Sequence, residues 1–481
     1  MSRVIDTDVL VIGSGPGGAT TAALLAEAGQ DVLLVEEGGR FHVDSAPDHS
    51  LEQMDEKWRS GGLTAALGKP KITYIEGRCV GGASETNAGL YHPPFPEVLQ
   101  RWAGEYGIEE MGPDALAPWL EEVERDIGVS RRPDGPGPAS EALARGAEAM
   151  GWRHTEIQRF WRYVQREDGS WGGQRRSMTE TMIPRALAAG CRLMSDTRVD
   201  RLDLDDRTAR SARAWTREEG REIAVQIRFK RVWVCAGAVQ TPRLLRKSGW
   251  TARIGNTLTM NPMIRLAAQF PDAVNVPALG VPVVQIEEFK PEMTLGCSYS
   301  AVPHLAMWLD GSAAERKAML QEWERMAVFY VKVSGKGRGS VRTWPVFDEA
   351  LVRQPVTAED LAGLGEGLCR LSQALFAAGA EVVHNPLVGG DVLTESGHAE
   401  RFRGALTPAN ISVSAIHLHS TCPMGERPDH SATDSFGCLR DADNVYINDS
   451  SLLPASPGVN PQGTIMAIAR RNVARSLGSS T

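Results

Sequence analysis

Two histidines in the carboxyl-terminal part of the chain are spaced for acid–base chemistry. The segment 411–419 alternates as a β-strand does, so His417 and His419 point to the same side of it. An imidazole has a pKa of about 6.5, and a neutral ring can therefore accept a proton. Further along, Asn460 precedes Pro461, a pair typical of a helix start with Asn460 as its cap. A carboxamide at this place can donate a hydrogen bond without taking up a proton.

The same residues could instead form a metal site. His417, His419, Cys422 and His430 are ligand types, but their spacing matches no standard zinc pattern. Cys422 has small, apolar or hydroxyl neighbours and no adjacent lysine, which favours a buried thiol. The cysteines are odd in number and form no CxxC pair, which fits a reducing cytoplasm. We therefore expect neither a metal centre nor a disulfide framework.

A glycine-rich turn near the amino terminus predicts a dinucleotide site. Residues 13–18 read Gly-Ser-Gly-Pro-Gly-Gly and stand between an apolar run and a helix-forming run. Glycines at Gly13, Gly15 and Gly18 let the backbone turn tightly and approach a pyrophosphate, whose charge is stabilised by the amino end of the helix. The order of strand, turn and helix makes this signal stronger than the glycine spacing alone.

Two further segments could complete this site. The apolar run 31–35 ends at Glu36, where a carboxylate can bind the hydroxyls of a ribose. Residues 77–89 form a second glycine-rich segment, in which short side chains such as Ser84 and Asn87 accompany the glycines. Such a segment lets the main chain lie against a flat ring, and a solvent-exposed loop is the alternative.

Size and charge limit the class of partner. The chain has 481 residues, which suggests two to four domains of roughly 150 residues each and leaves room for a pocket between them. The formal net charge of −8 provides no basic surface for nucleic acid or an anionic membrane. No signal peptide is recognisable, and no apolar run reaches the roughly 18 residues of a membrane span. We expect a cytoplasmic protein with small-molecule partners.

The order of the elements predicts a discontinuous nucleotide-binding domain. A second strand–turn–helix unit occupies 231–245, with Thr241 predicted as the cap of its helix, after alternating strands in 192–229. Residues 267–350 alternate in short runs, which favours an antiparallel sheet. Residues 357–380 form an amphipathic helix, which begins at a threonine with an aspartate three residues on.

Five ordered motifs make the chain resemble the glucose–methanol–choline (GMC) family of flavin-dependent alcohol oxidases and dehydrogenases. They are 13–18 with Glu36, 77–87, 237–249, 417–422 and 449–461. The resemblance implies FAD, and the absence of a histidine in 81–84 favours FAD that is not covalently attached. The cofactor contacts that it implies are Gly13, Gly15, Gly18, Glu36, Arg78, Gly81, Gly82, Ser84, Asn87, Ala88, Val199, Ala236, Asp449, Pro461 and Gln462.

The fold implied is α/β, with a discontinuous Rossmann-like FAD-binding domain and an inserted α+β substrate domain built on an antiparallel sheet. We predict that residues 1–108, 184–266 and 404–481 form the FAD-binding domain. Residues 109–183 and 267–403 would form the substrate-binding cap, whose sheet becomes the wall of the substrate pocket.

The resemblance also implies catalytic roles for His417 and Asn460. His417 would accept the proton of an alcohol, Asn460 would hydrogen-bond its oxygen, and a hydride would pass from the carbinol carbon to flavin N5. Two positions depart from the family pattern. Ser420 stands where the family usually has glycine, and His419 adds an imidazole that would shape the pocket, share in proton transfer or pack against a loop.

We therefore predict FAD-dependent oxidation of a primary or secondary alcohol to an aldehyde or ketone, with oxygen or another acceptor taking up the electrons. A non-redox lyase on the same scaffold, similar to hydroxynitrile lyases, is one alternative. A nicotinamide-dependent dehydrogenase is the other.

Overall fold

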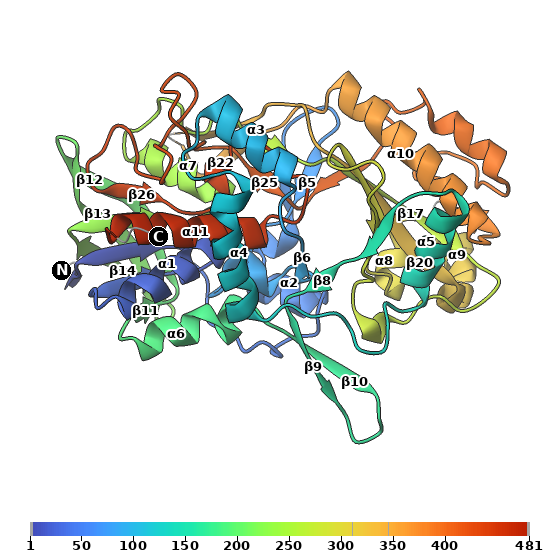
Figure 1. Ribbon diagram of the computed structural model, residues 1–481, viewed down its shortest axis with the longest axis horizontal. Helices are drawn as coiled ribbons and strands as arrows, with labels where there is room; N and C mark the ends of the chain where they lie inside the picture. The colour runs from blue at the N-terminus through green and yellow to red at the C-terminus, as the bar shows by residue number, and fades with distance from the viewer. Residues whose placement is uncertain (1–2, 310, 345, 479–481) are drawn as a thin grey trace.

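A five-stranded parallel sheet forms one half of the molecule, on the left in Figure 1. This computed structural model describes residues 3–309, 311–344 and 346–478. In spatial order the strands are β11 (Arg192–Met194), β3 (Val32–Val35), β2 (Val9–Ile12), β15 (Arg231–Val234) and β26 (Val445–Ile447). Every neighbouring pair is parallel. Segments from both ends of the chain thus share one sheet, as the predicted Rossmann-like fold requires.

Helices and a second sheet cover these strands. Helix α1 (Pro16–Glu27) follows β2 directly and packs against α11 (Gln462–Ser476) and α6 (Met182–Ala188), while α7 (Gly237–Lys247) follows β15. A four-stranded sheet lies beside them. It consists of β1 (Arg3–Asp6), β14 (Arg221–Arg228), β13 (Thr208–Glu218) and β12 (Thr197–Asp205). The alternating strands predicted in 192–229 are confirmed.

A nine-stranded sheet dominates the other half of the molecule. In spatial order its strands are β4 (Thr64–Ala66), β5 (Ile72–Tyr74), β24 (Val413–Ala415), β17 (Met263–Gln269), β20 (Met326–Val333), β19 (Met293–Cys297), β18 (Val284–Ile286) and β7 (His154–Glu156), and β23 (Val382–Val383) also pairs with β17. The predicted antiparallel sheet is confirmed at its centre, from β17 to β18. Between β24 and β5 the pairing is parallel.

One face of this sheet is apolar, and the other carries both polar side chains and a small apolar cluster that includes Ala267 and Val328; the part with the polar side chains is here called the polar face. Phe329 and Val331 of β20 belong to the hydrophobic core beneath α10 (Ala358–Ala377) and α5 (Pro138–Ala149). Because side chains alternate along a strand, Tyr330 and Lys332 must point to the opposite face. Figure 1 shows α10 on the outer, right-hand side of the sheet. The polar face is therefore the one turned towards the other half of the molecule.

Three helix starts test the predicted caps. Helix α10 begins after a Thr357–Asp360 capping box, as predicted. Helix α7, however, begins at Gly237 rather than after Thr241. It tolerates Pro242, which has no N–H for the carbonyl of Ala238, because the hydroxyl of Thr421 donates to that carbonyl at 2.8 Å. The prediction that Thr241 caps this helix is therefore wrong.

Helix α11 also differs from its prediction, by one residue. It begins at Gln462 with Pro461 as its N-cap, and no side chain caps it. The carbonyl of Pro461 accepts the first helical bond, from Ile465 N at 2.9 Å. Asn460 is therefore not the cap, and its carboxamide is left for other contacts.

The predicted domain ranges remain a proposal with two qualifications. First, the predicted boundary between residues 266 and 267 would cut through β17. Second, the nine-stranded sheet includes three strands from ranges assigned to the FAD-binding domain, namely β4, β5 and β24. The large sheet is thus built by both sets of ranges. No helix among the described residues is long and apolar enough to cross a membrane.

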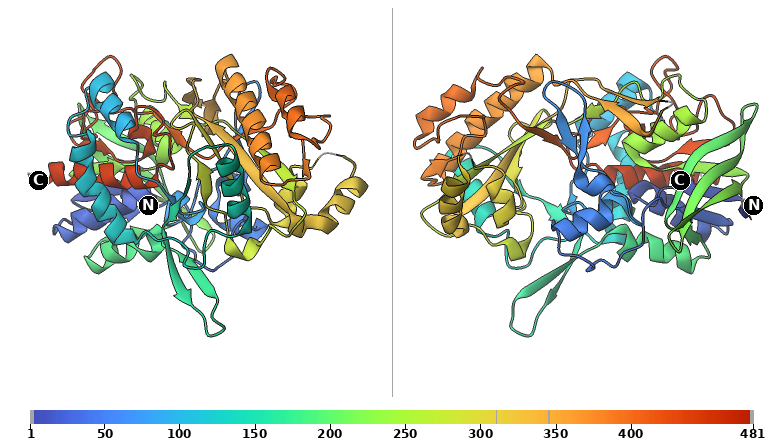
Figure 2. Two further views of the ribbon diagram at one scale, coloured as in Figure 1. Left: turned by 45° about the vertical axis from the view of Figure 1, so that its right-hand side comes forward. Right: turned by 180° about the vertical axis from the view of Figure 1, so that it is seen from behind.

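A two-stranded arm projects from the body in Figures 1 and 2. It consists of β9 (Trp161–Gln165) and β10 (Trp171–Arg175). At its root the indole of Trp161 donates to the carbonyl of Ala88 at 3.0 Å. A pocket of about 470 Å³ lies at the base of the arm, lined by residues such as Arg125 and Tyr163 and by none of the predicted site residues.

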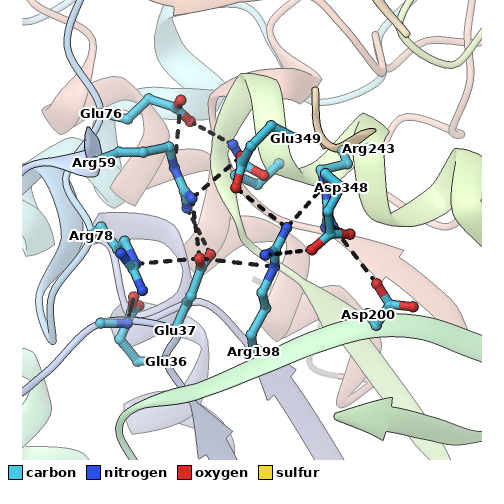
Figure 3. A network of polar contacts seen from close by, with 12 residues as sticks. Glu36, Glu37, Arg59, Glu76, Arg78, Arg198, Asp200, Arg243, Asp348 and Glu349 are labelled. Carbon is cyan, nitrogen blue, oxygen red and sulfur yellow. Dashed lines mark hydrogen bonds and ion pairs between the residues drawn. The ribbon is translucent and has the colours of Figure 1, made fainter. Parts of the chain in front are cut away.

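A network of ion pairs lies beside Glu36 (Figure 3). Glu37 contacts Arg59 at 2.7 Å and Arg78 at 3.3 Å, and Arg198 reaches it at 3.9 Å. Arg198 also pairs with Asp348 at 2.7 Å, on the hairpin formed by β21 (Ser340–Trp344) and β22 (Phe347–Arg353). Burial raises the pKa of Glu37, but its arginine partners outweigh this effect and lower it.

Removal of Arg59 should destabilise the protein strongly. Its side chain is only 9% exposed, so Arg59→Met would leave Glu37 and Glu76 without their buried partner. We expect a loss of about 3–5 kcal/mol in the free energy of unfolding, measured by urea denaturation of the holoprotein. Arg3→Met is the matched control, because the Arg3–Glu218 pair is half exposed, and it should change stability by less than about 1 kcal/mol. Equal losses in the two variants would contradict this account.

Candidate active site

The turn 13–18 has the shape that a bound pyrophosphate needs. Gly13 has a φ of 96°, and a Cβ there would lie 2.5 Å from the carbonyl oxygen of Cys235. A Cβ at Gly18 would lie 1.9 Å from the carbonyl oxygen of Gly13, so this glycine allows α1 to pack closely. At Gly15, the N-cap of α1, a Cβ would meet nothing within 4 Å. The open side of the turn is therefore at the amino end of the helix, where an anion is stabilised.

Ser14 joins the first glycine turn to the other predicted cofactor segments. Its backbone N and its Oγ donate to Oε2 of Glu36 at 3.0 and 2.8 Å, and its Oγ accepts from Gly81 N at 2.9 Å. Gly38 N donates to Oε1 of Glu36 at 3.0 Å. Burial raises the pKa of Glu36 although these bonds oppose the shift. Segment 77–89 is therefore packed against the turn rather than exposed as a loop.

The carboxylate of Asp449 connects the carboxyl-terminal motif with α7. Its Oδ2 accepts from Gly237 N at 2.8 Å and from the hydroxyl of Thr241 at 2.5 Å, while Oδ1 accepts from Ser451 N at 2.7 Å. Burial raises the pKa of Asp449, and these donors act against that rise. The turn at Ala236, which keeps accessible surface, is thereby held next to the motif that leads to Asn460.

Two residues predicted to contact the cofactor, Asn87 and Gln462, lie far apart in the sequence but are hydrogen-bonded to each other. The Nδ2 of Asn87 donates to Oε1 of Gln462 at 2.7 Å, at the first residue of α11. Asn87, Ala88 and Pro461 are only partly buried. These residues therefore present accessible surface together with the amino end of a helix, which carries a partial positive charge.

The remaining predicted cofactor residues are engaged within the protein. The hydroxyl of Ser84 donates to the carbonyl of Gly81 at 2.8 Å and accepts from the backbone N of Met178. The guanidinium of Arg78 belongs to the Glu37 network. Val199 is buried on β12, and Gly82 touches the first turn, since a Cβ on it would lie 2.8 Å from Cα of Gly15. Their contacts with the cofactor stay predictions.

His417 and Asn460 come together although they are far apart in the sequence. The Nδ2 of Asn460 lies 3.5 Å from Nε2 of His417. Nδ1 of His417 and Oδ1 of Asn460 are buried without a hydrogen-bond partner among the described residues. Since buried polar atoms are normally paired, these orphaned atoms indicate that a ligand completes the site.

The environment of His417 keeps its ring neutral. Burial lowers the pKa of His417 well below its usual range, and the positive charge of Lys332 and the neighbouring His419 lower it further. His419 has no exposed surface, and its pKa is lowered to about 3 by burial, Arg338 and Lys332. Both ring nitrogens of His419 lack partners in the described part of the chain. A role of His419 in catalysis stays a prediction.

The conformation of Ser420 shows why glycine is the usual residue of the family at this position. Its φ is 69°, which lies in the left-handed region that favours glycine. Its hydroxyl is buried without a hydrogen-bond partner among the residues that the structure describes. The position thus carries both backbone strain and an unsatisfied polar group, and a glycine would avoid both.

The candidate metal ligands do not form a centre. Among the described residues, no group of three or more histidine, cysteine, aspartate or glutamate side chains is placed to hold a metal ion. Burial raises the pKa of Cys422, which agrees with an inert buried thiol. All seven cysteines are unbridged.

These features fit FAD. The open side of the glycine turn at Gly15 would hold the pyrophosphate, Glu36 would bind a ribose, and Asn87 and Ala88 with Pro461 would offer a surface for the flavin ring. The glycines exclude side chains at the positions of close approach.

Comparison with known proteins agrees with this site. Models of the GMC oxidoreductase family match residues 54–263 and 348–469, and an FAD binding domain model matches residues 6–68. The chain belongs to the GMC oxidoreductase family, and its cofactor is FAD.

Three similar proteins illustrate the range of the family. An uncharacterized GMC-type oxidoreductase, y4nJ of Sinorhizobium fredii, is 37% identical over 473 residues, which cover 97% of this chain and 94% of the relative. Long-chain-alcohol oxidase FAO4A of Arabidopsis thaliana is 26% identical, over 97% of this chain and 68% of its own length. The crystal structure of pyridoxine 4-oxidase from Mesorbium loti matches with a TM-score of 0.77 at 19% identity, over 99% of this chain and all of that one.

Sequence reasoning missed Lys332, whose charge affects His417, and two further basic residues, Lys290 and Arg265. Lys332 lies on β20, and Lys290 pairs with Glu287 at 3.1 Å beside His92. Arg265 lies on β17, on the same face of the sheet as Lys332. A signal was present, because Lys332 is a single charged residue within the otherwise apolar run 327–333. The sequence does not show which face of the sheet Lys332 points to, because this depends on how the rest of the protein packs.

Substitution at the glycine turn should separate cofactor binding from folding. Gly15→Val places a side chain in open space, so the protein should fold as the wild type does but lose at least about a hundredfold in affinity for FAD, which is roughly 2.8 kcal/mol. Circular dichroism and flavin titration measure the two properties. Gly18→Val is the contrasting variant, since it would force side-chain atoms onto the carbonyl of Gly13 and disturb the fold itself. Normal FAD affinity in Gly15→Val would contradict the proposed position of the pyrophosphate.

The pKa of His417 can be tested directly. Because the pKa is lowered, the ring should stay neutral from about pH 8 down to about pH 5.5, where an ordinary imidazole becomes protonated. NMR of the holoprotein with isotope-labelled histidine reports the charge of each ring. The variant His417→Gln assigns the signal by removing it. If this signal titrates near pH 6.5, burial and the nearby positive charge do not lower the pKa of His417.

Proposed function

We propose that this protein oxidises a primary or secondary alcohol to an aldehyde or ketone. The observation that carries the proposal is the approach of Asn460 Nδ2 to His417 Nε2, with orphaned polar atoms on both side chains. The relative from Arabidopsis thaliana is named as a long-chain-alcohol oxidase, which supports oxidation at a carbinol carbon. A nicotinamide-dependent reaction is not proposed, because FAD is the cofactor.

The two side chains divide the work on the substrate hydroxyl. His417 is neutral before substrate binds, so Nε2 can take the hydroxyl proton without first losing one of its own. Asn460 Nδ2 donates a hydrogen bond to the substrate oxygen, where negative charge develops as the proton leaves. Bound FAD supplies the acceptor for the hydride of the carbinol carbon. One proton and one hydride thus leave the alcohol, and a carbonyl compound remains.

The surroundings of the pair shield it partly from water. His417 is bordered by β20 through Lys332 and by buried His419, and Asn460 precedes α11. Both side chains keep some accessible surface, through which a substrate can reach them. A bound substrate would displace the remaining water and strengthen the hydrogen bonds to its hydroxyl, because the local dielectric constant falls. The polar face of the nine-stranded sheet would form the opposite wall.

An anaerobic screen of alcohols tests the proposed reaction. A true substrate should bleach the flavin without oxygen, and His417→Ala should slow the bleaching by about 10²–10⁴-fold. Asn460→Ala should slow it by up to about 10²-fold, with FAD content unchanged. Each variant is first checked for bound FAD and for its circular dichroism spectrum. Product formation without bleaching would instead support the lyase alternative, and undiminished bleaching in His417→Ala would contradict the role of His417.

A further inference from the structure

The polar face of the nine-stranded sheet carries two cations. In the β17–β20 ladder, Lys332 is paired with Met263 and Arg265 with Tyr330. Paired residues of antiparallel strands share a face, so Lys332 and Arg265 are diagonal neighbours, with Cβ atoms roughly 7–8 Å apart. This face is the one turned towards His417, since the charge of Lys332 affects the pKa of that ring.

Lys332 is buried without an acidic partner in the described part of the chain. The residue is 7% exposed, and within the described ranges Nζ has neither a hydrogen-bond nor an ion-pair partner. Burial lowers its pKa to about 7, and the charge of nearby Lys290 contributes to this shift. A lysine ammonium is strongly hydrated, so leaving it buried and unpaired is unfavourable.

Arg265 also lacks an acidic partner. Its Nε donates to the hydroxyl of Ser298 at 3.2 Å and Nη1 donates to that of Ser414 at 2.8 Å, while the guanidinium lies 5.6 Å from the ring of Trp308. Burial lowers its pKa to about 10. No carboxylate of the described chain forms an ion pair with it. Arg265 is thus held by hydroxyl groups of the protein, which leaves Lys332 as the cation of this face without an acceptor among the described residues.

Other buried cations of the chain have carboxylate or carbonyl acceptors. Arg59 contacts Glu37 at 2.7 Å, Lys290 contacts Glu287 at 3.1 Å, and Arg470 contacts Glu122 at 2.7 Å. Arg471 and Lys57 have no ion pair, but they donate to backbone carbonyls. Lys332 differs because no acceptor among the described residues contacts its Nζ.

We propose that the substrate is an alcohol that carries a carboxylate, which Lys332 binds while its hydroxyl lies between His417 and Asn460. This inference rests on the proposed alcohol oxidation and adds the substrate class. A lysine ammonium forms a strong charge-assisted hydrogen bond with a carboxylate. A bound carboxylate also cancels the charge that weakens His417 as a base, so a hydroxy acid prepares the base for its own oxidation.

Binding of inert carboxylates tests the anion site independently of turnover. The holoenzyme is titrated with hexanoate and benzoate and with the corresponding amides, and the absorption of the oxidised flavin is followed. Carboxylates should bind saturably and more tightly than the amides. Lys332→Met should weaken carboxylate binding by about tenfold to a hundredfold, as expected for a lost hydrogen bond to a charged group, and should leave amide binding unchanged. Equal binding of carboxylates and amides by the wild type would overturn the proposal.

The matched control is Lys336→Met. Lys336 lies on the loop after β20, is half exposed and is 3.7 Å from Glu359, so its removal should not alter carboxylate binding. Lys332→Gln provides a second variant that keeps a polar end, and FAD content is measured in all three. If Lys336→Met weakens binding as much as Lys332→Met, the effect comes from overall charge and the proposal fails.

Turnover separates this proposal from the proposed function. The flavin is reduced anaerobically with ω-hydroxycarboxylates, beginning with glycolate, and with their methyl esters. We expect kcat/KM to favour the acids, and Lys332→Met to remove this preference. Bleaching by esters and acids alike, with no effect of Lys332→Met, would overturn the anion site and leave alcohol oxidation intact. A reaction without bleaching would instead contradict the proposed function itself.

Discussion

The active site depends on the hydrogen bonds of two consecutive residues, Asn448 and Asp449. The carboxamide of Asn448 donates to the hydroxyl of Thr21 on α1 and to the carbonyl of Ala469 on α11, while Asp449 holds the turn at Gly237. The glycine turn, the α7 turn and the helix that follows Asn460 therefore share one anchor. Because these polar groups are buried, each must be paired, and this requirement fixes the three segments relative to one another.

Electrostatics then divides the site into two regions. On the cofactor side, carboxylates such as Glu36 are surrounded by backbone N–H donors, and charge is balanced within the protein. On the sheet side, Lys332 lies near His417 without an acidic partner among the described residues. A neutral imidazole beside positive charge is a weak base until an anion arrives. The same arrangement that makes the empty site electrostatically unfavourable can therefore select the substrate.

Local patterns were enough to predict much of this structure. The glycine turn, the Asp449 motif, the α10 capping box and the His417–Asn460 pair all depend on residue types that have few alternative uses at their spacing. The helix starts at Gly237 and Gln462 were misplaced because Thr421 and Pro461 supply the bonds that decide them, and Thr421 is distant in sequence. Lys332 was missed for a similar reason, since alternation identifies a strand but not the side on which the rest of the protein packs.

The discontinuous parallel sheet has a consequence for how the protein is made. Strand β26 and helix α11 are synthesised after the other strands of this sheet, yet β26 completes the sheet beside β15, and α11 carries Gln462 to Asn87. Until these two elements are synthesised, the emerging polypeptide must keep the edge of β15 and the apolar side of α1 uncovered. Completion of the flavin site is consequently a late event in the synthesis of the chain.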